Sequence, residues 1–250
     1  VSDAELIKIA VKSLGLNDLH HFNPEEKIIE FVMAKEEQGK RLISLSLNDF
    51  MNETASESPA PGGGSVSAYI GALGVSLGTM VANLSSHKKG WDDRWKEFSD
   101  WAVRGKEIQN RLLALVDEDT DAYNRILEAY RLPKASREEK EERDEAVQKS
   151  MKNAIIVPFK VMEAAWSGFP ILREMVIKGN PNSVTDAAVG ALALRTCIRG
   201  AFLNVRINCK GLKDSAFVKE MIERGSILEA DAEKEEVEIL KLAALAIGHI

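Results

Sequence analysis

Apolar residues recur at every third or fourth position along most of this chain, and that spacing limits the fold more than any other feature of the sequence. Strict alternation of apolar and polar residues, the pattern of a half-buried strand, is nearly absent, and residues 41–47 alternate only briefly. We therefore predict an all-α fold, a bundle of long antiparallel helices that begins near residue 46.

Helix breakers divide this pattern into elements. Gly15, Gly90 and Gly211 are expected to end helices. Ser65 is placed to cap the helix that follows it, and Pro158 should kink or divide its helix because its ring clashes with the preceding turn. The predicted helices cover residues 4–14, 46–54, 66–84, 91–130, 136–178, 183–208 and 215 to the C-terminus, and a further helix begins at Pro24.

Two of these helices, over residues 66–84 and 183–208, are rich in glycine and alanine. Small residues on one side of a helix let another helix approach closely, so we expect both helices near the middle of the bundle. Residues 66–84 are also apolar enough to raise the question of a membrane span. Because Ser, Gly, Thr and Asn interrupt them, we interpret them as a buried helix of a soluble protein and predict no membrane partner.

Composition and charge exclude several classes of protein. The net charge is −6, so the chain as a whole is not a nucleic-acid binder by its field alone. Cys197 and Cys209 form no CxxC pair, and the four histidines have no metal-ligand spacing, so we predict neither a disulfide scaffold nor a metal site. The first residues lack the pattern of a signal peptide, and we expect a cytoplasmic protein.

The most unusual stretch is SPAPGGGS at residues 58–65. It is neither a Walker loop nor a GxGxxG turn that follows a strand. Two interpretations stay open: a flexible linker, or a set of free backbone N–H groups at a helix N-terminus that suits a carbonyl or an anionic group. The two prolines argue mildly against a flexible linker.

Asp119 lies in an acidic run, residues 117–121, that follows several leucines on one predicted helix. Such a run is usually a solvated face. However, a carboxylate that lies half-buried against the core can have a raised pKa and act as an acid or a base.

Asp186 lies one turn into the second helix that is rich in glycine and alanine, after Asn180 and Asn182, whose ordinary role is capping. Asn204 and Asn208 are four residues apart on one face of that helix. They are expected either to make polar helix–helix contacts or to bind a heteroaromatic ligand.

Basic residues form a smaller signal. Lys88 and Lys89 precede Gly90, and Arg199 adds positive charge to the second helix that is rich in glycine and alanine. Most such residues are solvated surface. Near the glycine run they would hold a carboxylate-bearing tail.

Three blocks of the chain resemble the formimidoyltransferase-cyclodeaminase family, in the family's order and spacing. They are SPAPGGGSVSAYIGALGVSLGTMVANLS (residues 58–85), LVDEDTDAY (115–123) followed by LP, and GNPNSVTDAAVGALALRTCIRGAFLNVRIN (179–208). The family often has Gly where this chain has His87 and Tyr where it has Trp91, which puts the edge of the basic site in doubt. The resemblance assigns residues 46–250 to the helical cyclodeaminase domain and residues 1–45 to a remnant of the transferase tail and its connector.

The resemblance implies a homodimer or higher homo-oligomer that binds tetrahydrofolate, polyglutamylated, as substrate and needs no metal. The implied reaction converts 5-formimidoyltetrahydrofolate to 5,10-methenyltetrahydrofolate and ammonia in histidine breakdown, with a formimidoyltransferase domain upstream. Two alternatives stay open: a methenyltetrahydrofolate cyclohydrolase and a non-catalytic helical dimerisation module.

Ring closure needs positioning, one proton shuttle and stabilisation of a cationic product, so a carboxylate near the reacting carbon is suitable. We expect Asp186 to be the main acid and base and Asp119 the second carboxylate. If both approach one site, their repulsion raises one pKa. The predicted substrate-binding residues are Pro61, Gly62, Gly63, Gly64, Ser65, Lys88, Lys89, Asn180, Asn182, Arg199, Asn204 and Asn208.

Overall fold

Helices and short 3-10 turns make up the regular structure, and the computed structural model contains no strand within its described residues, 3–18, 22–28 and 41–248. The prediction of an all-α fold is therefore confirmed. The chain divides into two units, Val1–Phe50 and Met51–Ile250, which are described separately. The domain boundary that we place after residue 45 stays a prediction.

The first unit holds short elements. Helix α1 (Asp3–Ser13) ends just before Gly15, whose φ of +62° lies in the left-handed region that favours glycine. The briefly alternating residues near position 41 form the turn η1 (Leu42–Ser44) rather than a strand. The other helices are α2 (Pro24–Lys27) and α4 (Leu47–Thr54), and α4 crosses the division between the units.

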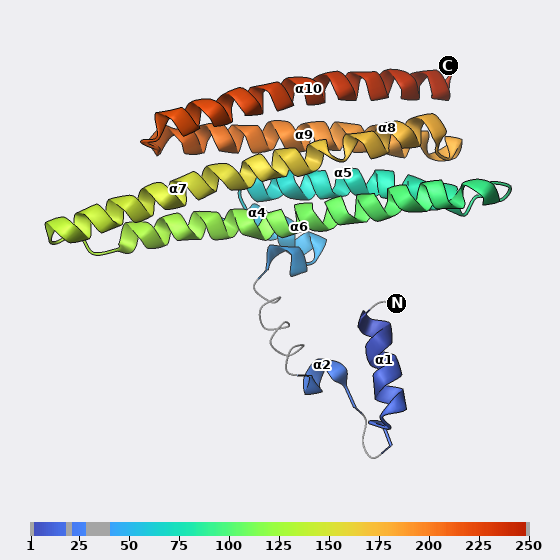
Figure 1. The fold of residues 1–250 in the computed structure, drawn as a ribbon, viewed down its shortest axis with the longest axis horizontal. Coiled ribbons are helices and arrows are strands. Elements are labelled where there is room, and N and C mark those ends of the chain that lie inside the picture. Colours follow the sequence, from blue (N-terminus) through green and yellow to red (C-terminus); the bar gives the residue numbers. More distant parts are fainter. Residues whose placement is uncertain (1–2, 19–21, 29–40, 249–250) are drawn as a thin grey trace. The chain divides into compact units, whose positions relative to one another are not determined.

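The second unit is a bundle of long helices, coloured from cyan to red in Figure 1. The 3-10 turns η2 (Asp92–Arg94), η3 (Pro181–Ser183) and η4 (Cys209–Gly211) join some of them. The six helices are α5 (Gly63–Ser86), α6 (Trp95–Arg131), α7 (Arg137–Trp166), α8 (Phe169–Lys178), α9 (Val184–Asn208) and α10 (Ser215–Ile247).

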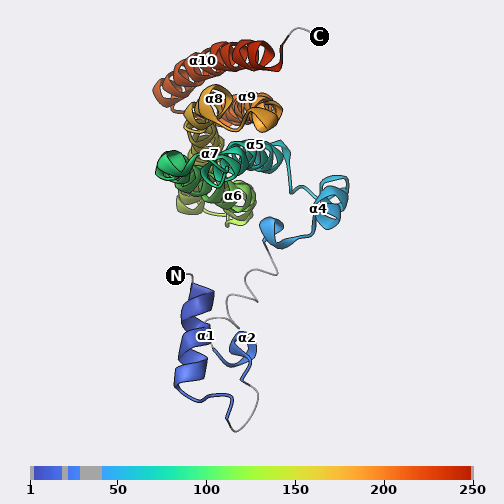
Figure 2. The same cartoon turned by 90° about the vertical axis from the view of Figure 1, so that its right-hand side faces the viewer.

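Helices α5 and α9 lie at the centre of the packing, as predicted. Helix α5 packs against α6 and α9, and α9 also packs against α7, α8 and α10. In the end view of Figure 2, α5 and α7 lie between α6 on one side and α8 and α9 on the other, and α10 is outermost. The core between these layers contains fully buried large side chains such as Leu112, Met162 and Ile198.

Glycines allow α5 and α9 to approach each other closely. A Cβ atom at Gly71 would lie 2.6 Å from the Sγ atom of Cys197, and one at Gly74 would lie 2.9 Å from the carbonyl oxygen of Gly190. These contacts leave no room for a side chain, so the two helices pack almost backbone to backbone. Burial in this contact raises the pKa of the Cys197 thiol to about 12, and the group stays a thiol at neutral pH.

Helix α7 continues through Pro158, so this proline does not divide the helix. Proline has no N–H, and the carbonyl of Ala154, four residues earlier, therefore lacks its usual helical donor. The side-chain amide of Asn208 in α9 donates to that carbonyl at 2.7 Å. A polar side chain from a neighbouring helix thus replaces the missing hydrogen bond at a buried position.

Three stretches of helix are long and apolar enough to cross a membrane by length and composition: Gly63–Ser86, Arg137–Lys178 and Pro181–Gly211. In each of them more than half of the most apolar window is buried inside the protein. Much of their apolar character is therefore used in packing between helices.

The hydrogen bond from the Asn208 amide to the Ala154 carbonyl leads to a testable prediction. Asn208→Ala should lower the free energy of unfolding by about 1–3 kcal/mol, because it leaves a buried carbonyl without a donor. In a Pro158→Ala background residue 158 regains its N–H, and the same substitution should cost less than about 0.5 kcal/mol. Urea unfolding of the four proteins of this double-mutant cycle measures both costs. Equal costs in the two backgrounds would show that Asn208 does not act through the Ala154 carbonyl.

Candidate functional site

A cavity of about 190 Å³ lies at the N-terminal end of α5. Its walls come from the loop before α5 and the first turn of that helix, from residues 119–126 of α6, from Ala154 of α7, and from Asn204 and Asn208 of α9. Residues from all three of the blocks singled out in the sequence therefore meet here. Pro61 is buried next to the cavity but does not line it.

The carboxylate of Asp119, in helix α6, is hydrogen-bonded to the start of helix α5. The hydroxyl of Ser65 donates to Oδ2 of Asp119 at 3.0 Å and lies 3.4 Å from the hydroxyl of Thr120. An anion at a helix N-terminus is favourable, because the first N–H groups and the helix dipole point toward it. The prediction that Ser65 caps α5 is wrong: the N-cap is Gly62, and the Ser65 side chain binds α6 instead.

Gly64 is the residue that admits this carboxylate. A Cβ atom at position 64 would overlap the carboxyl group of Asp119. Gly63 is similarly restricted, since a Cβ atom there would lie 3.3 Å from the side-chain nitrogen of Asn204. The glycine run is therefore a tightly packed helix start that two polar side chains approach, and the interpretation as a flexible linker is wrong.

The surroundings of Asp119 change its acidity. Burial raises the pKa of the Asp119 carboxyl above its ordinary value of 3.8, and hydrogen bonds from the Ser65 hydroxyl and backbone partly offset that rise in pKa. A carboxyl group with a raised pKa at a cavity wall holds a proton more readily than an ordinary aspartate does, which suits it to give and take a proton.

The two asparagines of α9 direct their amide nitrogens to backbone carbonyls. Asn204 donates to the carbonyl of Gly200 at 2.9 Å, and Asn208 donates to that of Ala154. Both residues line the cavity. Each side chain is thus fixed by its nitrogen, and its carbonyl oxygen is left as the atom with which it can accept a hydrogen bond from a ligand.

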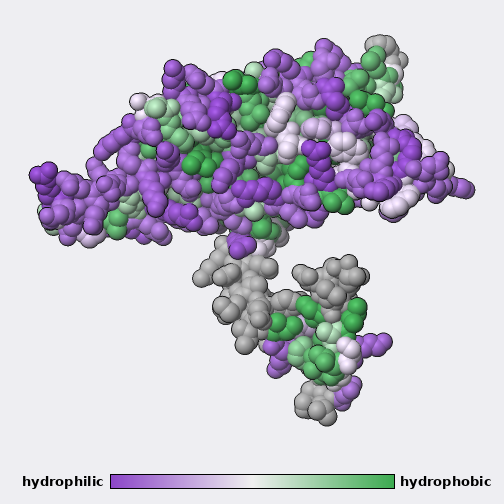
Figure 3. Space-filling model, viewed as in Figure 1, coloured by the Kyte–Doolittle hydropathy of each residue, from purple (hydrophilic) through white to green (hydrophobic). Residues whose placement is uncertain are grey.

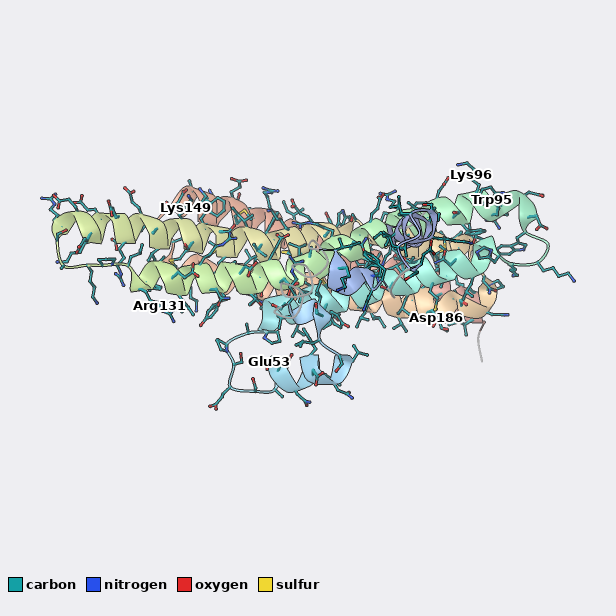
Figure 4. The ribbon with its side chains drawn as sticks, turned by 90° about the horizontal axis from the view of Figure 1, so that it is seen from below. Glu53, Trp95, Lys96, Arg131, Lys149 and Asp186 are labelled. Carbon is teal, nitrogen blue, oxygen red and sulfur yellow. The ribbon has the colours of Figure 1, made fainter. Side chains whose placement is uncertain are left out.

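Asp186 does not line this cavity. It lies in the first turn of α9, whereas Asn204 lies 18 residues further along, about 27 Å away at the helical rise. Figure 4 shows Asp186 toward the end of the bundle where α6 begins at Trp95, far from Arg131 at the end of α6. The expectation that Asp186 and Asp119 approach one site is therefore wrong within a single chain. The sequence could not reveal this, because it does not show which end of α9 borders the glycine run. The catalytic role of Asp186 stays a prediction.

Other predicted binding residues lie at the same end as Asp186. The backbone N–H of Asn180 donates to Ser85 Oγ at 2.8 Å, and the Asn180 side chain accepts from the backbone of Asn182. The ammonium group of Lys88 lies 4.1 Å from the ring centre of Trp91. These residues and Lys89 follow or adjoin the C-terminal end of α5, about 30 Å from Gly63 and Gly64.

Arg199 faces α10 rather than the cavity. Its guanidinium lies 3.5 Å from Glu229, and its side chain is 68% exposed. Together with Lys88 and Lys89 it was predicted to hold a carboxylate-bearing tail, and none of the three lines the cavity within one chain. Their role in binding stays a prediction.

Sequence reasoning missed several residues of the cavity wall, among them Thr120, Tyr123 and Ala154. Tyr123 had a detectable signal, since it follows Asp119 by four residues and so shares its helix face. Ala154 had none, because only its backbone carbonyl is involved. Within the described parts of the chain no group of three or more His, Cys, Asp or Glu side chains is arranged to hold a metal ion. The absence of a metal stays a prediction.

Comparison with known proteins gives consistent matches. Residues 46–226 match the family model described as "Formiminotransferase-cyclodeaminase", and residues 1–34 match that of the "Formiminotransferase domain". Formimidoyltransferase-cyclodeaminase of Mus musculus is 34% identical over 98% of this chain and 44% of its own length. Methenyltetrahydrofolate cyclohydrolase of Methylorubrum extorquens is 32% identical over 77% of this chain and 93% of its own length.

A solved structure has the same fold. The crystal structure of formiminotetrahydrofolate cyclodeaminase from Thermotoga maritima aligns with a TM-score of 0.70 and 29% identity, covering 80% of this chain and 96% of that one. This chain spans less than half of the length of the mammalian relatives that it matches.

The raised pKa of Asp119 predicts a specific dependence of stability on pH. Between 3.8 and the folded-state pKa the folded protein binds more protons than the unfolded chain, so this carboxyl makes the free energy of unfolding fall as pH rises through that window. Asp119→Asn removes this contribution. As pH rises through this window, the free energy of unfolding of the variant should therefore increase relative to that of wild type. Above the window the difference between the two should stay constant.

Urea unfolding from about pH 3 to pH 8 measures this difference. Asp121→Asn, the same change at an exposed position of α6, is the control. In Ser65→Ala the window should extend to higher pH, because a hydrogen bond that lowers the pKa of Asp119 is lost. A pH-independent difference between Asp119→Asn and wild type would contradict the raised pKa.

Proposed function

Since this chain belongs to the formiminotransferase-cyclodeaminase family, we propose that it is a folate-dependent one-carbon enzyme that converts 5-formimidoyltetrahydrofolate to 5,10-methenyltetrahydrofolate and ammonia. The observation that carries the proposal is the Asp119 carboxyl. It has a raised pKa, lies at a cavity wall, and accepts hydrogen bonds from Ser65 at the start of a glycine-rich helix. Such a group can move protons at a carbon that becomes cationic.

In the proposed reaction N10 of the folate attacks the carbon of the protonated amidine on N5. A bond forms between N10 and that carbon, and the C=N double bond opens. The proton of N10 passes to Asp119 and from there to the amino group. The C–N bond to this group then breaks, ammonia leaves, and the remaining carbon is the methenyl cation. One carboxyl therefore serves as base and then as acid.

The charge of the site suits this product. As the proton leaves Asp119 its carboxylate becomes an anion next to the methenyl cation, which favours the product over the neutral adduct. The carbonyl oxygens of Asn204 and Asn208 are the acceptors available for N–H groups of the pterin. Gly63 and Gly64 lie in the first turn of α5, where backbone N–H groups have no helical acceptor and suit a carbonyl or an anionic group.

A cyclohydrolase is the second candidate, because a relative of that name covers 77% of this chain. In that reaction water attacks the methenyl carbon, and no ammonia is produced. Ammonia release from the formimidoyl substrate distinguishes the two enzymes. A non-catalytic dimerisation module would bind no folate, so its melting temperature would not rise with added tetrahydrofolate.

Other parts of the proposal rest on the relatives. Residues 1–34 match a transferase domain model, and we therefore propose that a formimidoyltransferase domain is linked to this domain and that both act in histidine breakdown. A polyglutamylated substrate, a homodimer and a cytoplasmic location are further proposals of the same kind.

The direct test replaces the proton carrier. Asp119→Asn should lower the rate of ammonia release from 5-formimidoyltetrahydrofolate by about 10²- to 10⁴-fold, the usual contribution of a general acid or base. Binding of tetrahydrofolate, measured by thermal shift, should persist, since the amide keeps the shape of the side chain.

Asp121→Asn is the matched control and should keep the wild-type rate, because Asp121 is exposed on α6 and does not line the cavity. Turnover of Asp119→Asn within a factor of about three of wild type would remove Asp119 from the catalytic role. Wild-type protein that forms formyltetrahydrofolate from the methenyl compound but releases no ammonia would establish the cyclohydrolase instead.

A further inference from the structure

Two hydroxyl groups at the cavity are used differently from other hydroxyl groups of the bundle. A serine or threonine inside a helix commonly donates to the carbonyl four residues earlier. On α5 and α9 the hydroxyls that donate in this way are those of Ser67, Ser76, Thr79, Ser85 and Thr196. Within the described residues the hydroxyls of Ser65 and Thr120 make no such bond, and they instead contact each other and Asp119 across two helices. Their orientation toward the carboxyl is therefore not a result of ordinary helix geometry.

The direction of these hydrogen bonds follows from the number of protons. A hydroxyl group carries one proton, and Ser65 donates its proton to Oδ2 of the Asp119 carboxylate at 3.0 Å. In the 3.4 Å contact between the two hydroxyls Thr120 is therefore the donor and Ser65 the acceptor. A hydroxyl that accepts a hydrogen bond becomes a stronger donor, because hydrogen bonds in a row polarise one another. Thr120 thus strengthens the bond that Asp119 receives, although its own hydroxyl bonds to Ser65.

This row of hydroxyls makes the two oxygens of the Asp119 carboxyl unequal. Oδ2 accepts from Ser65, which is fully buried, whereas Oδ1 accepts from no side chain in the described parts of the protein. A proton on Oδ2 would require both hydroxyls to turn around, so that Thr120, at the cavity wall, donates into the cavity. A proton on Oδ1 leaves both hydrogen bonds as they are, and Oδ1 is therefore the better position for it.

We propose that Thr120 is a positioning residue for Asp119: through the Ser65 hydroxyl it keeps Oδ2 as a hydrogen-bond acceptor and leaves Oδ1 as the oxygen that exchanges protons with a ligand in the cavity. Two donors in a row stabilise the carboxylate form. In the reaction proposed above, N10 gives its proton to Oδ1, and the same oxygen passes that proton to the leaving amino group. This use in turnover rests on the proposed function, whereas the effect of Thr120 on the carboxyl does not.

Other charged groups do not account for the acidity of Asp119. Figure 3 shows one side of the bundle, whose surface is mainly hydrophilic, but charge does not extend into the cavity. Among the described residues that line it, those of α5, α7 and α9 are uncharged, and Tyr123 of α6 is the one other titratable group. On α6 itself Glu118 is paired with Arg111, and Asp121 is exposed. The hydrogen bonds from Ser65 are the interactions that lower the pKa of the Asp119 carboxyl, so a change in them changes that pKa directly.

Titration of the carboxyl in the ligand-free protein tests the positioning. Heteronuclear NMR of protein with labelled aspartate carboxyls follows Asp119, whose signal is identified by its loss in Asp119→Asn. Thr120→Val keeps the shape of the side chain but removes its hydroxyl. The pKa of Asp119 should then rise by about 0.2–0.6 unit, because a neighbouring hydrogen bond adds about 10–30% to a charge-assisted one. Ser65→Ala, which removes the direct donor, should raise it further.

Two further variants separate the hydroxyl from the shape of the side chain. Thr120→Ser restores the hydroxyl and should return the pKa of Asp119 to within about 0.1 unit of wild type. Thr79→Val makes the same change at a half-buried threonine of α5 that donates to the Val75 carbonyl, and it should leave that pKa unchanged. Should Thr120→Val not fold to a helical protein, Thr120→Ala replaces it with the same expected rise. An Asp119 pKa that does not move without the hydroxyl, or that Thr120→Ser does not restore, would overturn the proposal.

The pH dependence of ammonia release tests the role in turnover. Asp119 begins the proposed reaction as a base, so the acidic limb of kcat/KM reports its pKa in the ligand-free enzyme. In Thr120→Val this limb should move to higher pH by the same amount as the NMR titration, while the rate above the limb stays within about threefold of wild type. A rate that falls equally at every pH, together with an unmoved Asp119 pKa, would show a merely structural role and sink the proposal.

The two measurements also separate this inference from the proposed function. If the NMR titration of Asp119 moves in Thr120→Val but the acidic limb does not, Asp119 is not the base of the reaction. Wild-type protein that releases no ammonia would likewise contradict the proposed function. In both cases a moved titration that Thr120→Ser restores leaves the positioning by Thr120 standing.

Discussion

Close contact between α5 and its neighbours depends on glycines that leave no room for a side chain. Gly71 and Gly74 bring α5 against α9, and Gly64 admits the carboxylate of Asp119 from α6. Small residues occupy these sides of α5, and three of its larger apolar residues, Leu73, Met80 and Leu84, are exposed. The tight packing and these exposed apolar side chains are therefore two results of one distribution of residues around a helix.

Packing this tight requires polar groups to find partners on other helices. The Ala154 carbonyl receives the Asn208 amide, Ser65 donates to Asp119, and Ser85 accepts from the backbone of Asn180. An unpaired polar group at these positions would cost about 1–3 kcal/mol, so the pairs fix how the helices meet. The cavity lies where two of these pairs come together at the start of α5, and its chemistry comes from groups that also hold the fold.

The all-α fold and most helix positions could be predicted, because apolar spacing and glycine or proline breaks are local properties. Asp119 and the glycine run were also predicted, from an acidic run after leucines and from an unusual composition. The cap at Ser65 was not predicted correctly, because its hydroxyl binds a residue 54 positions away. The position of Asp186 could not be predicted either. Its neighbours in sequence show that it begins a helix, but only the antiparallel arrangement of α5 and α9 decides which end of the bundle that is.

The carboxylate of Asp119 has both a structural and a proposed chemical role, since it binds the start of α5 and faces the cavity. A proton that arrives on it removes the negative charge that attracts the positive end of the helix dipole. In a reaction that uses this group, the junction between α5 and α6 would thus loosen and tighten once per turnover. Proton transfer at Asp119 and the stability of the contact between α5 and α6 are therefore coupled. A substitution that changes the rate of one is expected to change the other.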